Sequence, residues 1–448
     1  MLRLSARWVL PIRGAPIPGG AVLVGDDGRI AAVGPNAAVP RPALAVARQL
    51  GPVALLPGLV NTHAHLELTG LRGLVRDPPF AEWVGTVRRL KDALQQRHFE
   101  ASATWGVLEH FAAGITTIGD TGSSTEPARA MAELGARGVA YHEVFGPDPA
   151  RLGESVSGLS HQLTVLDDCA SERLRIGVSP HAPYTVSEPL LRAVADAALA
   201  LSRPLAMHLA ESREEDAFVR TGSGPFAEAH ARRGIPVTAR GVSPIAWALD
   251  NGLAALRPLL IHCVKASEAD IARMAACGAT VAHCPWSNAA LGHGRANLAA
   301  MRAGGLAVGL GTDSVVAGGA TDLFAEARYA ALGGGGSLSP RDMLGLITGQ
   351  GARALGVAGA GALSPGAWGD LTAVSLGRAP FGGGDAGTDP EAALAWSATA
   401  ADVLATWVGG RCVYERGHWP GVDAAAARTA VAEAHRAALA ALGAPRVS

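Results

Sequence analysis

Histidines recur at the ends of short apolar runs of the sequence, where their side chains could do chemistry together. Six of the fourteen histidines occupy such positions: His63, His65, His181, His208, His262 and His283. A single buried histidine is usually bonded to backbone groups, because an unpaired buried polar group costs ~1–3 kcal/mol. Six of them after separate runs indicate one shared site, since imidazoles bind metals and transfer protons.

Four of these side chains have the types and spacing of metal ligands. His63 and His65 are one residue apart, so the two-residue period of a strand points both imidazoles to the same side. Together with His208 and with Asp313, which lies in a Gly-Thr-Asp-Ser turn, they make a set of three imidazoles and one carboxylate that leaves room for a water. A helix N-cap is the alternative for Asp313. The set predicts a site for a divalent metal ion, Zn²⁺ in the first place and Fe²⁺ as the alternative.

Two further side chains are expected to handle protons. Glu211 follows His208 by three residues, so its carboxylate should lie over the water at the metal, placed to take a proton and later to deliver it to a leaving group. His262 should hydrogen-bond the same water. We therefore expect Glu211, His262 and Asp313 to be catalytic. A solvated surface charge is the alternative for Glu211.

Three other residues are expected to contact the substrate. His181 lies between Pro180 and Pro183, which fix the backbone around it. Trp83 lies in the long segment after the first apolar run, and Asn288 could recognise the polar edge of a heterocycle. Core packing is the alternative for Trp83, and a tight turn is the alternative for Asn288.

The elements that must position these residues alternate regularly. From about residue 55 to 355, short β-branched runs alternate with amphipathic or Ala-rich stretches of helical length. The eight runs are Leu55–Thr62, Ile115–Asp120, Gly138–Phe145, Leu174–Ser179, Pro204–His208, Leu259–Val264, Ala279–Cys284 and Leu306–Thr312. This pattern predicts an α/β fold, a (β/α)8 TIM-type barrel whose site lies at the C-terminal ends of the strands. An open doubly wound sheet is the alternative, but no Gly-x-Gly-x-x-Gly loop follows a run.

Both ends of the chain carry short alternating runs typical of antiparallel strands. We expect residues 1–54 and 356–420 to form one small discontinuous β-sandwich domain, although two separate β appendages are the alternative. Residues 55–355 are then the metal-dependent barrel, and residues 421–448 contain a C-terminal helix.

Composition limits the kinds of partner. The chain has 448 residues, 49% apolar and 17% charged, and a net charge of -1, which excludes general disorder and argues against capture of nucleic acid or an anionic membrane. Its five scattered cysteines include no Cys-x-x-Cys pair, and no stretch approaches the roughly 20 apolar residues of a membrane span. We expect a cytoplasmic protein with a small-molecule, purine-type substrate. Its oligomeric state is open, and a homo-oligomer is one alternative.

The motifs together resemble those of the amidohydrolase superfamily, and more narrowly its mononuclear zinc deaminase branch. They are Pro57–His65, Ser179–Tyr184, His208–Glu211, His262, His283–Pro285 and Gly311–Asp313. Two-metal relatives of such barrels bridge their ions with a carboxylated lysine after strand four. Here the only lysines are Lys91 and Lys265, neither in that segment, so the resemblance implies one ion.

Other segments are most similar to aminodeoxyfutalosine deaminases of menaquinone biosynthesis. They are His65–Thr69, Phe80–Trp83, Phe218–Pro225 and the Ser243-Pro244 insertion. The resemblance implies hydrolysis of the 6-amino group of an adenine ring with release of ammonia. It departs at Trp286, where relatives commonly have Arg. The alternatives are a deaminase of S-adenosylhomocysteine, adenosine or guanine, a triazine hydrolase, or an inactive barrel that serves as a scaffold.

Overall fold

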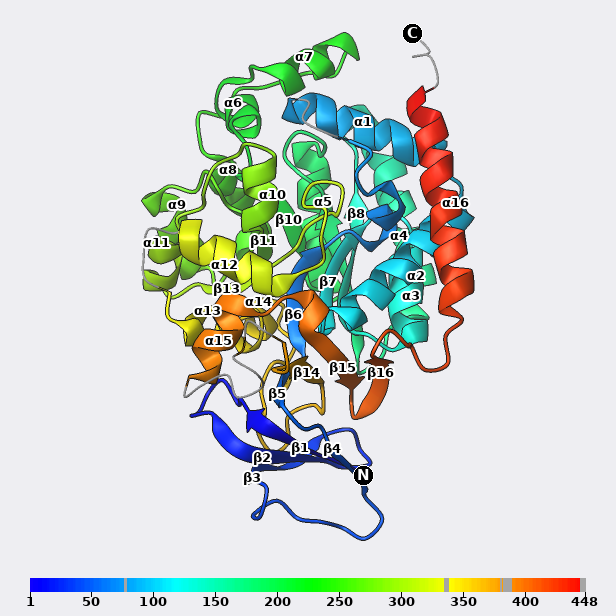
Figure 1. The fold of residues 1–448 in the computed structure, drawn as a ribbon. Helices are drawn as coiled ribbons and strands as arrows, with labels where there is room; N and C mark the ends of the chain where they lie inside the picture. Colours follow the sequence, from blue (N-terminus) through cyan, green and yellow to red (C-terminus); the bar gives the residue numbers. More distant parts are fainter. Residues whose placement is uncertain (76–78, 334–337, 379–380, 382–388, 444–448) are drawn as a thin grey trace.

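Eight parallel strands at the centre of the molecule form two four-stranded sheets (Figure 1). The computed structural model describes residues 1–75, 79–333, 338–378, 381 and 389–443. The first sheet has the order β6-β7-β8-β9 and the second the order β10-β11-β12-β13. The strands are β6 Leu59–Ala64, β7 Ile115–Gly122, β8 Arg137–Val144, β9 Leu174–Pro180, β10 Ala206–Leu209, β11 Leu259–His262, β12 Thr280–His283 and β13 Ala307–Leu310. The chain therefore has the predicted α/β class, and each predicted run overlaps one of these strands.

Isolated parallel β-bridges connect the two sheets at both pairs of neighbouring edges. Val178 in β9 pairs with Leu205 just before β10, and Ala64 at the end of β6 pairs with Asp313 after β13. The strand neighbours thus follow the order of an eight-stranded barrel. Nearly every strand position is buried, as in a parallel sheet with helices on its outer face.

The prediction of a single strand over Leu55–Thr62 is wrong. Gly58 divides it: β5 (Val53–Pro57) belongs to another sheet, and β6 begins at Leu59. A Cβ on Gly58 would lie only 2.1 Å from the Thr116 hydroxyl oxygen, so the crossing needs glycine. Sequence hydrophobicity is continuous across this point because both strands are buried.

Both ends of the chain meet in one further sheet, below the parallel strands in Figure 1. Its order is β16-β15-β14-β5-β1-β2-β3, and β4 also pairs with β1. The strands are β1 Leu2–Val9, β2 Ile17–Val24, β3 Ile30–Pro35, β4 Val46–Gln49, β14 Leu371–Ser375, β15 Val403–Val408 and β16 Arg411–Glu415. The two termini therefore contribute to one hydrogen-bonded sheet. Its division into sandwich layers and the predicted domain boundaries stay predictions.

Helices surround the parallel strands, and several gather at the C-terminal ends of the strands. Those at that end are α1 Phe80–Ala93, α6 Arg213–Thr221, α7 Pro225–Arg232 and α10 Pro285–Ala290. The others are α2 Gln96–Ala112, α3 Glu126–Leu134, α4 Leu152–Asp167, α5 Glu188–Ala200, α8 Pro244–Asp250, α9 Glu268–Ala276, α11 Leu298–Ala303, α12 Leu323–Gly333, α13 Pro340–Leu346, α14 Gly349–Ala354 and α15 Pro390–Ser397.

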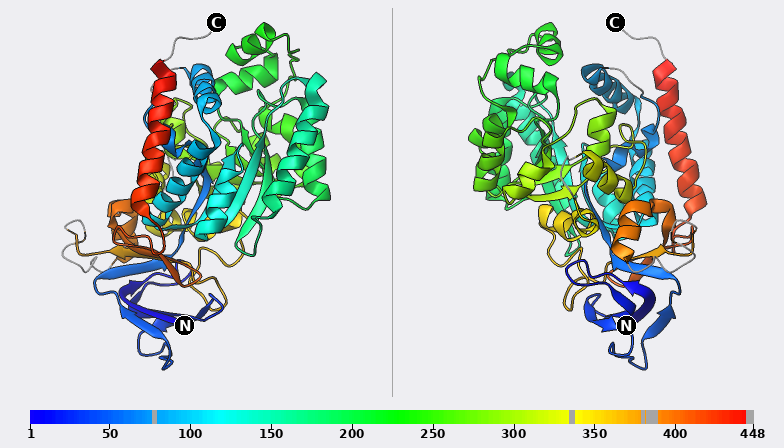
Figure 2. Two further views of the ribbon diagram at one scale, coloured as in Figure 1. Left: turned by 90° about the vertical axis from the view of Figure 1, so that its right-hand side faces the viewer. Right: turned by 60° about the vertical axis from the view of Figure 1, so that its left-hand side comes forward.

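The C-terminal helix α16 (Ala424–Gly443) lies beside α1 and α2 on the outside of the molecule (Figure 2). Residues 444–448 of the predicted C-terminal segment lie outside the described residues. Among the helices of the described residues, none combines the length and apolar character needed to cross a bilayer.

Candidate metal and catalytic centre

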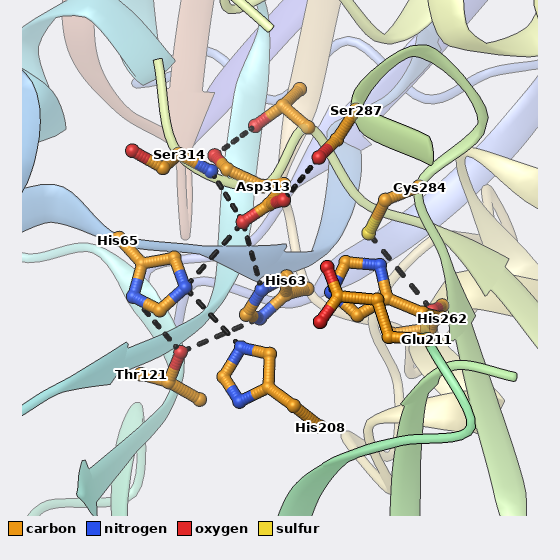
Figure 3. Close-up of polar contacts among 12 residues, drawn as sticks. His63, His65, Thr121, His208, Glu211, His262, Cys284, Ser287, Asp313 and Ser314 are labelled. Atoms are coloured by element: carbon orange, nitrogen blue, oxygen red, sulfur yellow. Dashed lines mark hydrogen bonds and ion pairs between the residues drawn. The ribbon is translucent and has the colours of Figure 1, made fainter. Parts of the chain in front are cut away.

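The four predicted ligands come together at the C-terminal ends of the parallel strands (Figure 3). His63 and His65 lie at the end of β6, His208 lies in β10, and Asp313 lies in the turn after β13. Asp313 has a left-handed backbone φ of 56°, a conformation that costs a non-glycine residue about 1–3 kcal/mol. The chain thus holds strained backbone at the point where this carboxylate enters the centre.

The facing donor atoms are spaced like the ligands of a tetrahedral ion. Asp313 Oδ1 lies 3.2 Å from His63 Nε2 and 3.4 Å from His65 Nε2, and His65 Nε2 lies 3.3 Å from His208 Nε2. Zinc bonds of about 2.0–2.1 Å place tetrahedral ligands roughly 3.3–3.4 Å apart. His63 Nε2 is buried and has no hydrogen-bond partner among the described residues. The donor set therefore fits a divalent metal ion.

Groups behind the ligands fix their orientation. His208 Nδ1 lies 3.2 Å from the His181 carbonyl oxygen, so it donates there and leaves Nε2 unprotonated toward the centre. The Thr121 hydroxyl lies 3.3 Å from His65 Nδ1. Asp313 accepts hydrogen bonds from the Ser287 hydroxyl and, at 2.6 Å, from the Ser314 backbone N–H. His65, His208 and Asp313 are thereby presented with a free donor atom facing the centre.

Burial keeps the imidazoles neutral at pH 7. Desolvation lowers the pKa of His65 to about 3, and it also lowers the pKa of His63 and of His208. A neutral imidazole has a free lone pair, whereas the protonated ring cannot bind a cation. The site is therefore prepared to bind a metal without first losing protons.

The predicted proton-handling pair lies beside this donor set. Glu211 Oε1 is 3.5 Å from His262 Nε2, and both side chains are buried. The Glu211 backbone N–H donates to Glu215 Oε2 at 2.8 Å, which fixes the turn after β10. His262, which ends β11, has a left-handed φ of 72°. A carboxylate next to an imidazole can exchange protons with a reacting group that lies against both.

Asn288 lies beside His262, and its predicted contact with the substrate stays a prediction. Its Oδ1 accepts from His262 Nδ1 at 2.9 Å, so its oxygen orients His262. This leaves only the Asn288 amide nitrogen, which is buried without a partner among the described residues, for the predicted contact with substrate. His283, whose Nδ1 is likewise unpartnered there, lies buried at the end of β12.

The other two predicted substrate residues line the surroundings of the centre. The His181 ring lies 4.9 Å from the His208 ring and stacks on Phe145. Trp83, on α1, lies in an aromatic group with Phe80, whose ring centroid is 6.3 Å away. Substrate contact by either residue stays a prediction.

Two buried side chains of this region are not indicated by the sequence patterns above. Glu143 Oε1 lies 3.9 Å from His208 Nδ1 and 4.0 Å from His181 Nε2, and burial raises the pKa of this carboxyl to about 8. Its place near the end of the run Gly138–Phe145 is the signal that could have revealed it. His293 Nε2 lies 3.2 Å from Glu211 Oε1. His293 follows α10 in an irregular segment, and no sequence periodicity points to it.

The centre combines three imidazoles and a carboxylate at the ends of parallel strands with a buried acid beside them. This arrangement is typical of metal-dependent hydrolases. Residues 54–413 match the Amidohydrolase family, so this chain belongs to that family. The chain is a hydrolytic enzyme of this family, in agreement with its similarity to deaminases, and its donor set fits a divalent metal ion.

Three known proteins illustrate the relationship. The chain is 32% identical over 441 residues to a 5-methylthioadenosine/S-adenosylhomocysteine deaminase of Symbiobacterium thermophilum, covering 92% of this chain and 93% of that protein. It is 31% identical over 329 residues to an aminodeoxyfutalosine deaminase of Deinococcus radiodurans, covering 71% and 77%. Its fold matches a crystal structure of an adenosine deaminase from Xanthomonas campestris with bound zinc, with a TM-score of 0.82, 24% identity and 98% of both chains covered.

Proposed function

We propose that this protein is a hydrolytic deaminase that removes the 6-amino group of an adenine nucleoside as ammonia. One observation supports it most directly: four donor atoms from three distant parts of the chain face one another, with the buried Glu211–His262 pair beside them. In this proposal His63, His65, His208 and Asp313 hold one zinc ion, with Fe²⁺ as the alternative. We infer also that the two parallel sheets close into a (β/α)8 barrel.

The chain's own residues then divide the chemistry. A bound zinc ion supplies a water whose pKa falls from 15.7 toward about 7. Glu211 takes the proton and delivers it to the ring nitrogen beside the attacked carbon, because general acids and bases must lie within hydrogen-bond reach of the reacting atoms. His262, oriented by Asn288, and Asp313 hold the attacking oxygen through hydrogen bonds. The remaining proton of the added hydroxyl then passes to the amino nitrogen, the C–N bond breaks as the C=O bond forms, and ammonia leaves.

Two substrates are the leading candidates. Aminodeoxyfutalosine is supported by the segment resemblances and by the Deinococcus relative. A second candidate, 5′-methylthioadenosine, is supported by relatives that align over more than 90% of the chain. Trp286 also favours 5′-methylthioadenosine. Relatives commonly have Arg at this position, whereas the indole, whose ring centroid lies 4.7 Å from that of Tyr329, carries no positive charge to pair with a substrate carboxylate. The methylthio group is uncharged and needs no such partner.

A panel of substrates tests the proposal. Ammonia release would be measured with aminodeoxyfutalosine, 5′-methylthioadenosine, S-adenosylhomocysteine, adenosine, guanine and a chlorotriazine. We expect activity on an adenine nucleoside, and a Glu211→Ala variant should keep one equivalent of zinc while losing two or more orders of magnitude in kcat. Glu154→Ala, on the exposed face of α4, serves as the control. Activity confined to guanine or the triazine, or a near-normal rate in Glu211→Ala, would refute it.

A further inference from the structure

Glu211 faces two imidazoles rather than one. His262 Nε2 lies 3.5 Å from Glu211 Oε1, and His293 Nε2 lies 3.2 Å from the same oxygen. The side chain of His293 is only 2% exposed, and apart from this ion-pair contact its Nε2 has no hydrogen-bond partner within the described residues. A buried imidazole nitrogen is costly to leave unpaired, so the contact with the Glu211 carboxylate is the interaction that satisfies it.

The surroundings hold His293 firmly at this point. Its backbone N–H donates to the Asn288 carbonyl at 2.8 Å, and its carbonyl accepts from Lys265 Nζ at 2.7 Å. Gly292 and Gly294 on either side have positive φ values of 72° and 98°, which fold the segment so that the ring points inward. Lys265 is one of only two lysines in the chain.

The ring of His293 also connects Glu211 to the covering helix. It meets the Phe80 ring of α1 edge-on, with centroids 4.5 Å apart. Asn288 both orients His262 through its side chain and anchors His293 through its carbonyl. One short segment after β12 thus positions both imidazoles that face Glu211.

We propose that His293 is a positioning residue for Glu211, and that its imidazole nitrogen fixes Glu211 Oε1 against His262 for proton transfer. This inference rests on the proposed function of Glu211 as the acid and base. A misplacement of about 1 Å in a catalytic group can cost about 100-fold in rate. The side chain acts through Glu211 and does not itself touch the reacting atoms.

The test replaces the imidazole of His293 with an aromatic ring that has no nitrogen atoms. His293→Phe preserves the contact with Phe80, and His293→Gln restores an N–H donor near the former Nε2. On the best substrate of the panel, His293→Phe should lower kcat about 10- to 100-fold with KM changed by less than about threefold. His293→Gln should recover most of that loss. Zinc content and Tm should remain close to those of the wild type in both variants.

A double-mutant cycle separates positioning from a merely structural role. Adding His293→Phe to Glu211→Gln should change the residual rate by less than about threefold, because the residue that His293 positions is already disabled. An equal loss in both backgrounds, or no loss in the wild-type background, would overturn the inference. If the wild type releases no ammonia from any compound, the proposed function fails by itself. The crystal structure of zinc-loaded His293→Phe then decides: displacement of the Glu211 carboxylate supports positioning, and an unmoved carboxylate overturns it.

Discussion

At the scale of single residues, the hydroxyl of Ser287 determines how firmly Asp313 is held. It donates to Asp313 Oδ2, while the Ser314 backbone N–H donates to Oδ1. Groups that orient a metal ligand typically contribute 10- to 100-fold to metal affinity. We therefore expect Ser287→Ala to weaken zinc binding about 10- to 100-fold, measured by competition with a chromophoric chelator.

A neighbouring serine provides the control for this measurement. Ser314→Ala removes a hydroxyl and keeps the backbone N–H that binds Asp313 Oδ1, so its zinc affinity should stay near that of the wild type. Equal affinities in the wild type and Ser287→Ala would show that the hydroxyl does not support the ligand.

At the scale of elements, a buried ion pair connects α1 to the strand ends. Glu67, which follows β6, is fully buried and pairs with Lys91 of α1. It also accepts from the backbone and hydroxyl groups of Ser123 and Ser124, after β7. Burial alone would raise the pKa of Glu67. The charge and hydrogen bond of Lys91, together with the hydrogen bonds of Ser124, instead hold this pKa at about 2, below its usual 4.5. The pair thus positions the helix that carries Phe80.

This depressed pKa predicts how stability depends on pH. The contribution of ionised Glu67 to the free energy of unfolding is fully present above pH 4.5 and is lost as the pH falls toward about 2. In this range Glu67 takes up a proton more readily in the unfolded chain than in the folded chain, and this favours unfolding. Glu67→Gln should cost about 3 kcal/mol at pH 7 at ~1.4 kcal/mol per pH unit, and the difference from the wild type should shrink below pH 4.5.

Urea unfolding of the metal-free proteins between pH 7 and pH 3 would measure this difference. Asp92→Asn is the matched control on the same helix, because Asp92 and Arg88 are an exposed pair whose loss should leave stability nearly unchanged. A constant difference between Glu67→Gln and the wild type down to pH 3 would contradict the assignment.

At the scale of the whole molecule, one buried ion pair connects the parallel strands to the terminal sheet. Arg137, at the start of β8, donates from Nε to Asp370 Oδ2 at 2.6 Å, and both side chains are 1% exposed. Asp370 precedes β14 and also accepts from the Gly409 backbone N–H at 2.7 Å. The Arg137 guanidinium lies over the Trp368 ring at 3.9 Å. The parallel sheet that contains β8 and the terminal sheet that contains β14 are therefore joined through a charged contact that water does not reach.

Breaking this contact should destabilise the whole chain. Asp370→Ala leaves the Arg137 charge buried without its partner, which typically costs about 3–5 kcal/mol. Unfolding by urea, followed by far-UV circular dichroism, would measure the loss. Glu172→Ala is the control, because it removes an exposed partner of Arg29, whose guanidinium also lies over Trp368. Similar stabilities of the two variants would contradict the importance of the buried pair.

Local patterns in the sequence predict the order of the parallel strands and bring the proposed donor residues to one edge of the sheet. Strand positions follow from the alternation of apolar runs and helical stretches, and in a parallel sheet the residues after each strand lie at one edge. His63, His208, Glu211 and Asp313 can therefore be grouped from the sequence alone.

The contacts around that group depend instead on long-range packing. The division at Gly58, the contact of Asn288 with His262 and the approach of His293 to Glu211 follow from how loops far apart in the chain pack. Such loops carry no periodic pattern, because their conformation is set by positive-φ glycines, backbone hydrogen bonds and neighbouring side chains. Local sequence signals indicate which residues are buried and with what periodicity. The pairing of two side chains that are distant in the sequence depends on the tertiary packing of the folded chain.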